Sequence, residues 1–196
     1  QKVHYNEYYG QEFSLLARKD KAVPDVRQVP QIEIGLHTEP GKSAAWASAD
    51  DLVEMAGIIL DNNFMPSLDN LDALKKTTAL RPQAIVGFFV KDFTSAREAA
   101  VNGARILILS GDLLGRAEIS RLNREFPTAK VLFEMPSKGG DLIERIAAAV
   151  ATGVDGVVLK TFNDTLEALK EEGLALKDLR ARYPQLIIWV AGGIWG

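Results

Sequence analysis

A lysine and a glutamate stand at the ends of two apolar segments of this sequence. Lys160 closes the run 156–160, whose other residues are apolar or glycine, and Glu134 lies near the end of the run 131–135. Apolar surroundings remove water from a lysine amine and favour its uncharged form, which is the nucleophile that forms Schiff bases. A neighbouring carboxylate would then act as a proton relay. A lysine that extends into solvent and a structural salt bridge explain the same residues, so both alternatives stay open.

A pair of glycines late in the chain indicates a second kind of site. Gly192 and Gly193 follow the apolar run 186–191. Successive glycines leave backbone N–H groups open to an anion, and barrel enzymes often bind phosphate in a loop at this place. Simple turn geometry explains the two glycines equally well. With Thr161 and Ser110, which follow or end other apolar runs, they are the predicted contacts for a phosphorylated substrate.

The residues that several other chemistries require are missing or isolated. The sequence has no cysteine, which excludes thiolate zinc sites and cysteine nucleophiles. Its two histidines, His4 and His37, form no cluster with Asp or Glu at metal-ligand spacing. Nothing like a nucleophile elbow accompanies His37, so a Ser/His/Asp triad is not indicated. We therefore expect no metal site.

The elements that position these residues follow a regular pattern. From residue 83 onward, short apolar runs alternate with amphipathic segments, which is typical of buried parallel strands joined by helical crossovers. Strands are expected at 84–90, 105–110, 131–135, 156–160 and 186–191. Helices are expected at 95–102, 116–126, 141–152, 166–169 and 176–183. The first helix is predicted to begin at Thr94 or Ser95, and the third to end at a left-handed Gly153.

The N-terminal part of the chain has a weaker pattern. Strands are expected at 31–37 and 63–66, and helices at 48–60 and 68–78. Residues 1–30 are interpreted as an N-terminal extension, and residues 31–196 as one (β/α) barrel-type domain.

The sequence predicts six or seven strands, whereas a closed barrel of this class has eight. The predicted fold is therefore an α/β TIM-type barrel that is incomplete or lacks its last strand, with an open doubly wound parallel sheet as the alternative. In both folds the functional site lies at the carboxyl ends of the strands. An unpaired strand edge beside Trp189 and Trp195 would be a surface for self-association.

Composition limits the partners. The 196 residues carry a net charge of −3, with no basic cluster or stripe, so nucleic-acid and membrane-surface binding are not indicated. The sequence shows no apolar signal core and no run of membrane-spanning length, and we expect a cytoplasmic protein.

Three late segments resemble class I aldolases of the deoxyribose-phosphate aldolase type. They are Lys130–Glu134, Gly153–Thr161 and Ile188–Ile194, about the last third of the chain. The resemblance implies Schiff-base chemistry at Lys160 and phosphate binding at the glycine pair, and Asp112 is the nearest acid to the fourth-strand aspartate of that family. Lys160 stands five residues after Asp155, where the family has three, and the second active-site lysine of the family falls near Trp189.

These features predict a lyase or isomerase that acts on a small phosphorylated carbonyl compound without a cofactor. Its predicted catalytic residues are Lys160, Glu134 and Asp112. One alternative is an FMN-dependent barrel oxidoreductase with the Gly192 and Gly193 loop on the FMN phosphate. Another alternative is a non-catalytic barrel-like protein that forms homo-oligomers.

Overall fold

The described part of the chain forms one parallel sheet. The computed structural model describes residues 33–35, 48–61, 65–110, 114–137, 141–161 and 177–192. The sheet has seven strands, which are hydrogen-bonded in the order of the sequence, and every neighbouring pair is parallel. The strands are β1 (Glu33–Gly35), β2 (Met65–Leu68), β3 (Gly87–Val90), β4 (Ile106–Ser110), β5 (Lys130–Pro136), β6 (Gly156–Thr161) and β7 (Ile187–Gly192).

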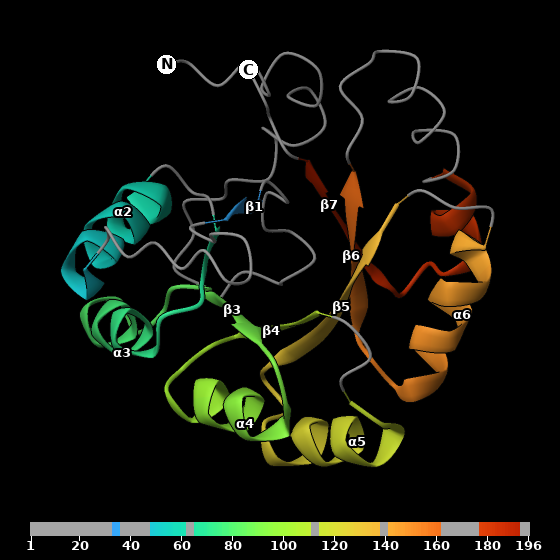
Figure 1. Ribbon diagram of the computed structural model, residues 1–196, viewed down its shortest axis with the longest axis horizontal. Helices are drawn as coiled ribbons and strands as arrows, with labels where there is room; N and C mark the ends of the chain where they lie inside the picture. Colours follow the sequence, from blue (N-terminus) through green and yellow to red (C-terminus); the bar gives the residue numbers. More distant parts are fainter. Residues whose placement is uncertain are drawn as a thin grey trace.

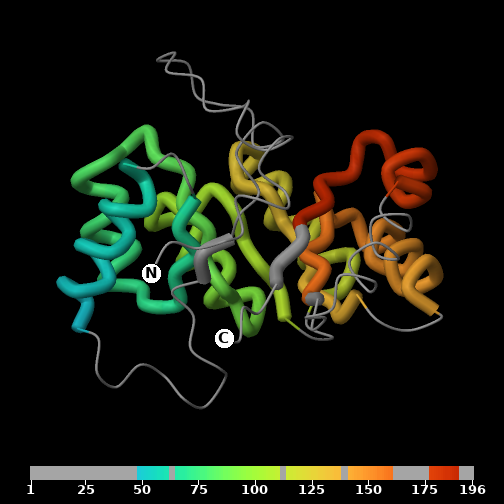
Figure 2. Tube along the Cα trace, turned by 90° about the horizontal axis from the view of Figure 1, so that it is seen from above, coloured from blue at the N-terminus to red at the C-terminus, as the bar shows by residue number. Residues whose placement is uncertain are grey.

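Helices connect the strands and lie on the outside of the curled sheet (Figure 1). They are α2 (Ala49–Asp61), α3 (Leu71–Leu80), α4 (Phe93–Val101), α5 (Arg116–Glu125) and α6 (Leu142–Thr152), and residues 177–182 are helical before β7. Seen from above, the N-terminal elements lie on one side of the molecule and the C-terminal elements on the other (Figure 2). A doubly wound sheet reverses its strand order and carries helices on both faces. In the part of the chain that the structure describes, the order does not reverse, so these seven strands form a (β/α) barrel-type sheet.

Two apolar cores lie on the two faces of the sheet. The outer core joins the strands to the helices, and in β4 it takes Leu107 and Leu109. The inner core lies inside the curl and takes the alternate residues Ile106 and Ile108. Successive side chains of a strand point to opposite faces, so a strand covered on both faces is a continuous apolar run. The members of the inner core are Met65, Ile85, Ile106, Ile108, Leu132, Val158, Ile187 and Trp189.

Gly156 allows the inner core to pack closely. It pairs with Leu132 of β5 and with Ile187 of β7. A Cβ atom on Gly156 would lie 2.6 Å from Cβ of Ile187 and 2.7 Å from Cδ2 of Leu132, and would also collide with the Ile187 carbonyl oxygen. No side chain larger than hydrogen fits there.

The helix expected at 68–78 begins only at Leu71, because Leu68 still belongs to β2 and Asn70 caps the helix. The helix expected at 166–169 and the predicted extension 1–30 lie outside the described residues.

The start of α4 also differs from the prediction. We predicted Thr94 or Ser95 as its N-cap, but the cap is Asp92. The Asp92 carboxylate accepts the backbone N–H of Ser95, and the Ser95 hydroxyl accepts the backbone N–H of Asp92. This reciprocal capping box satisfies two N–H groups together, which a cap at Thr94 or Ser95 does not do. Gly153 ends α6 with a φ of 94°, so its predicted left-handed conformation is confirmed.

The exposure of the Trp189 side chain differs from the prediction. We interpreted Trp189 as part of an exposed edge, but it is 2% exposed and belongs to the inner core. The sheet curls around the inner core and so covers this side chain. The number of predicted strands does not reveal that curl. Trp195 lies outside the described residues.

Candidate active site

Ser110, Glu134 and Lys160 come together at the carboxyl ends of three neighbouring strands. The Ser110 hydroxyl donates to Oε2 of Glu134 at 2.6 Å. The Lys160 Nζ atom lies 2.8 Å from Oε1 of the same carboxylate. The glutamate therefore bridges β4 and β6, and the predicted proximity of Glu134 and Lys160 is confirmed.

The sheet register explains this meeting. Ser110 pairs with Glu134, and Glu134 pairs with Val158. Residues aligned across parallel strands point to the same face, and residues two apart in one strand share that face. Lys160 lies two residues beyond Val158, and Val158 belongs to the inner core. The three polar side chains thus project into the curl, directly after the apolar residues that fill it.

The carboxylate is buried, whereas the amine reaches toward solvent. The Glu134 side chain is 8% exposed and the Lys160 side chain is 34% exposed. The ammonium approaches Oε1 at the distance of an ion pair but without the alignment of a hydrogen bond. A buried carboxylate is costly unless it is paired and hydrogen-bonded. Lysine supplies the opposite charge and serine the hydrogen bond.

A second lysine–carboxylate pair lies at the other end of the same strands. Lys130 begins β5, and its Nζ donates to Oδ1 of Asp155 at 2.9 Å. Oδ2 of Asp155 accepts the backbone N–H of Val131, also at 2.9 Å. The Lys130 side chain is 36% exposed, close to the value for Lys160. The two pairs are similar in chemistry and differ in the end of the barrel that they occupy.

Comparisons with known proteins bear on the fold. No protein-family model and no curated protein sequence matches the chain. A crystal structure of 3-hexulose-6-phosphate synthase is similar over 74% of this chain and 75% of its own, with a TM-score of 0.50 and 17% identity. The 3-hexulose-6-phosphate synthase of Salmonella typhimurium is similar over 84% of this chain and 79% of its own, with a TM-score of 0.61 and 17% identity.

The chain is a (β/α) barrel-type protein. At 17% identity, the likeness concerns the fold and not the reaction. In this fold the functional site lies at the carboxyl ends of the strands. The Ser110, Glu134 and Lys160 side chains occupy that end, and Lys130 and Asp155 occupy the opposite end, where conserved groups usually serve stability.

The other predicted site residues are described only in part. Gly192 is the last residue of β7 and pairs with Thr161, beside the pair of Lys160 and Ala191. The end of β7 therefore adjoins the lysine. Asp112, Gly193 and the side chain of Thr161 lie outside the described residues, and so do His37 and its neighbours.

Within the described residues, no three His, Cys, Asp or Glu side chains are grouped as ligands of a metal ion. Among the helices described, none has the length and apolar character to span a bilayer.

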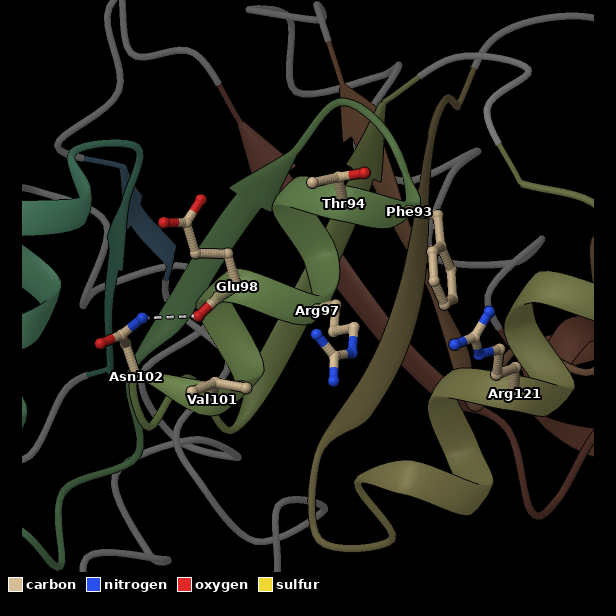
Figure 3. Close-up of a pocket in the computed structure, with 7 residues that line it drawn as sticks. All are labelled: Phe93, Thr94, Arg97, Glu98, Val101, Asn102 and Arg121. Carbon is tan, nitrogen blue, oxygen red and sulfur yellow. Dashed lines mark hydrogen bonds between the residues drawn. The ribbon is translucent and has the colours of Figure 1, made fainter.

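A surface groove lies between α4 and α5, on the outside of the barrel (Figure 3). The Arg121 guanidinium lies 5.0 Å from the centroid of the Phe93 ring. Arg121 and Arg97 both donate to Glu125, at 2.7 and 3.0 Å. Hydrogen bonds from Arg121 and then Arg97 lower the pKa of Glu125. The sequence pattern did not single out these residues. Their hydrogen bonds link α4 to α5.

Proposed function

We propose that this protein is a lyase or isomerase that acts on a small phosphorylated carbonyl compound through the amine of Lys160. One observation carries the proposal: a buried glutamate joins the lysine to a serine on the inner face of the barrel, at the carboxyl ends of the strands. The resemblance of the late strands to class I aldolases supports the same role for Lys160.

The geometry gives each side chain a step in Schiff-base formation. Lys160 must lose a proton before its nitrogen attacks the substrate carbonyl carbon, and Oε1 of Glu134 is 2.8 Å away to accept it. After attack, the carbinolamine loses its hydroxyl with a proton returned from Glu134, so that one water leaves and a C=N bond forms. Ser110 holds the other carboxylate oxygen and thereby orients the relay.

The end of β7 is the proposed phosphate site. Gly192 and Thr161 are paired beside Lys160, and Gly193 follows in the sequence. Backbone N–H groups in such a loop can hold an anion a short distance from the amine. The two similar structures are, by their names, synthases of a hexulose 6-phosphate, which is a phosphorylated carbonyl compound. Asp112, two positions after Ser110 in the sequence, stays a predicted catalytic acid.

Borohydride trapping tests the amine. The protein is incubated with dihydroxyacetone phosphate or glyceraldehyde 3-phosphate and reduced with borohydride, and the modified peptide is identified by mass spectrometry. Reduction converts a Schiff base into a stable secondary amine, so the adduct should form on Lys160. The Lys160→Met variant should form no adduct.

Lys130→Met is the matched control, because it removes a lysine of similar exposure and pairing from the opposite end of the barrel. This variant should be trapped as efficiently as the parent protein. Adducts spread evenly over the lysines, or trapping that persists in Lys160→Met, would show that Lys160 is not the reactive amine.

A further inference from the structure

Trp189 lies in the same row of the sheet as Ser110 and Glu134 of the candidate active site. Ser110 pairs with Glu134, Glu134 with Val158, and Val158 with Trp189. We call these four residues the rim row. All four project from the inner face, because aligned residues of parallel strands share a face. The side chain of Trp189 therefore flanks the glutamate and lysine from the side of β7.

The indole N–H of Trp189 has no acceptor among the described residues. The Nε1 atom is buried and lacks a hydrogen-bond partner in the part of the chain that the structure describes. A buried tryptophan usually finds an acceptor for this group, and leaving a buried donor unpaired is costly. A phenylalanine or leucine would fill an apolar core without that cost. Trp189 thus adds a hydrogen-bond donor to the rim row, and none of the described residues accepts its hydrogen bond.

The spacing of the strands sets what such a donor can reach. Neighbouring strands are about 4.8 Å apart, so Trp189 and Glu134, two strands apart, have Cα atoms about 10 Å from each other. Val158, which carries a short side chain, stands between them. The carboxylate and the indole each extend several ångströms from the backbone. A molecule of three or four carbon atoms is long enough to contact both groups.

We propose that the Trp189 N–H binds a hydroxyl or carbonyl oxygen of the substrate beside the Glu134 and Lys160 pair. This inference rests on the proposed function, because it assigns the substrate to the same end of the barrel. Trp189 is then a specificity-determining residue. It favours compounds that carry an oxygen next to the reacting carbon, since an analogue without that oxygen leaves the buried N–H unpaired.

Nuclear magnetic resonance of the full chain tests the contact directly. The three tryptophans give three indole N–H signals, and the signal of Trp189 is the one lost in Trp189→Phe. The protein is titrated with glycerol 3-phosphate, whose hydroxyl groups can accept a hydrogen bond but which cannot form a Schiff base. The Trp189 signal should move downfield as its N–H gains an acceptor. The affinity of Trp189→Phe should be weaker by about tenfold, the worth of one lost hydrogen bond.

Lys130→Met is the control, because it changes a side chain at the opposite end of the barrel, and its affinity should equal that of the parent protein. Thermal unfolding checks that both variants fold, and the signal shift in the parent does not depend on either variant. An unmoved Trp189 signal, equal affinities, or no binding by the parent would overturn the proposal. An equal shift with inorganic phosphate alone would also overturn it, because the donor would then bind phosphate.

The two proposals can fail separately. If borohydride trapping fails while glycerol 3-phosphate moves the Trp189 signal, the amine chemistry is wrong and the Trp189 contact stands. If trapping succeeds and the signal stays in place, the contact is wrong and the amine chemistry stands.

Discussion

Gly156→Ala should strongly destabilise the barrel. The added Cβ would lie 2.6 and 2.7 Å from carbon atoms of Ile187 and Leu132, whereas carbon atoms pack favourably at about 3.5–4.0 Å. An overlap of about 1 Å must therefore be relieved, and one of the obstructing atoms is the backbone carbonyl oxygen of Ile187, which is fixed by strand pairing. Overpacking costs about 1–3 kcal/mol, and the fixed backbone puts this case at about 3 kcal/mol or more. That is a large fraction of a total stability of about 5–15 kcal/mol.

Urea and thermal unfolding measure this effect. For a domain of this size, a loss of about 3 kcal/mol lowers Tm by roughly 10 °C. Gly57→Ala is the matched control, because Gly57 lies inside α2 and its added Cβ would meet only the Arg81 guanidinium, at 3.6 Å. That variant should gain about 0.5–1 kcal/mol, since alanine is the better helix former. A Gly156→Ala protein as stable as its parent would refute the close packing of β5, β6 and β7.

Two further predictions concern charged groups. In a double-mutant cycle with Lys160→Met and Glu134→Gln, urea unfolding should give a coupling of about 1 kcal/mol. Exposed ion pairs contribute about 0.2–1 kcal/mol, and the burial of the Glu134 carboxylate puts this pair at the upper end. Additive effects would show that the pair contributes nothing. Hydrogen bonds from Ser95 lower the pKa of Asp92 below its ordinary 3.8, so its stabilising effect is present above that pH and is lost as the pH falls through the lowered value. The Tm difference between the parent and Asp92→Ala should therefore be larger near pH 6 than near pH 2.5, and a constant difference would exclude the carboxylate charge as the cause.

Much of the barrel could be predicted because its strands are buried on both faces. Strands such as Ile106–Ser110 and Gly156–Thr161 are continuous apolar runs up to their last one or two residues, and the turns between strands carry strong signals such as Gly153. The predicted strands around Val86, Ile108, Leu132, Val158 and Ile188 are indeed adjacent and parallel in that order, although the first of them begins at Gly87.

The parts that were not predicted have physical causes as well. The stretch from Asp92 to Ser95 offers three capping side chains, and only the geometry of the reciprocal bonds selects the first. The second strand was expected at 63–66 but is Met65–Leu68. Proline lacks an N–H group and is unusual inside a strand, yet Pro66 is the second residue of β2, so the sequence gives a poor signal for this strand.

The candidate site was predicted in its strand positions but not in its contacts. Lys160 and Glu134 each lie near the end of a strand, and strand topology places both at one end of the barrel. The bond from Ser110 depends on the register of β4 against β5, which the sequence does not state. The inward direction of Trp189 was also hidden, because the segment around it is apolar on both faces and its alternation gives no sign of which face is inside.

The order of the strands has a consequence for how this chain acquires its structure. Among the described residues, each strand pairs with the strands next to it in the sequence, and partners such as Ser110 and Glu134 are 24 positions apart. Contacts between segments near in sequence close small loops, which costs little chain entropy and favours fast folding. A ribosome releases the chain from its N-terminus, so each new strand emerges after its partner is already available. The described strands can therefore pair one after another as the chain is synthesised.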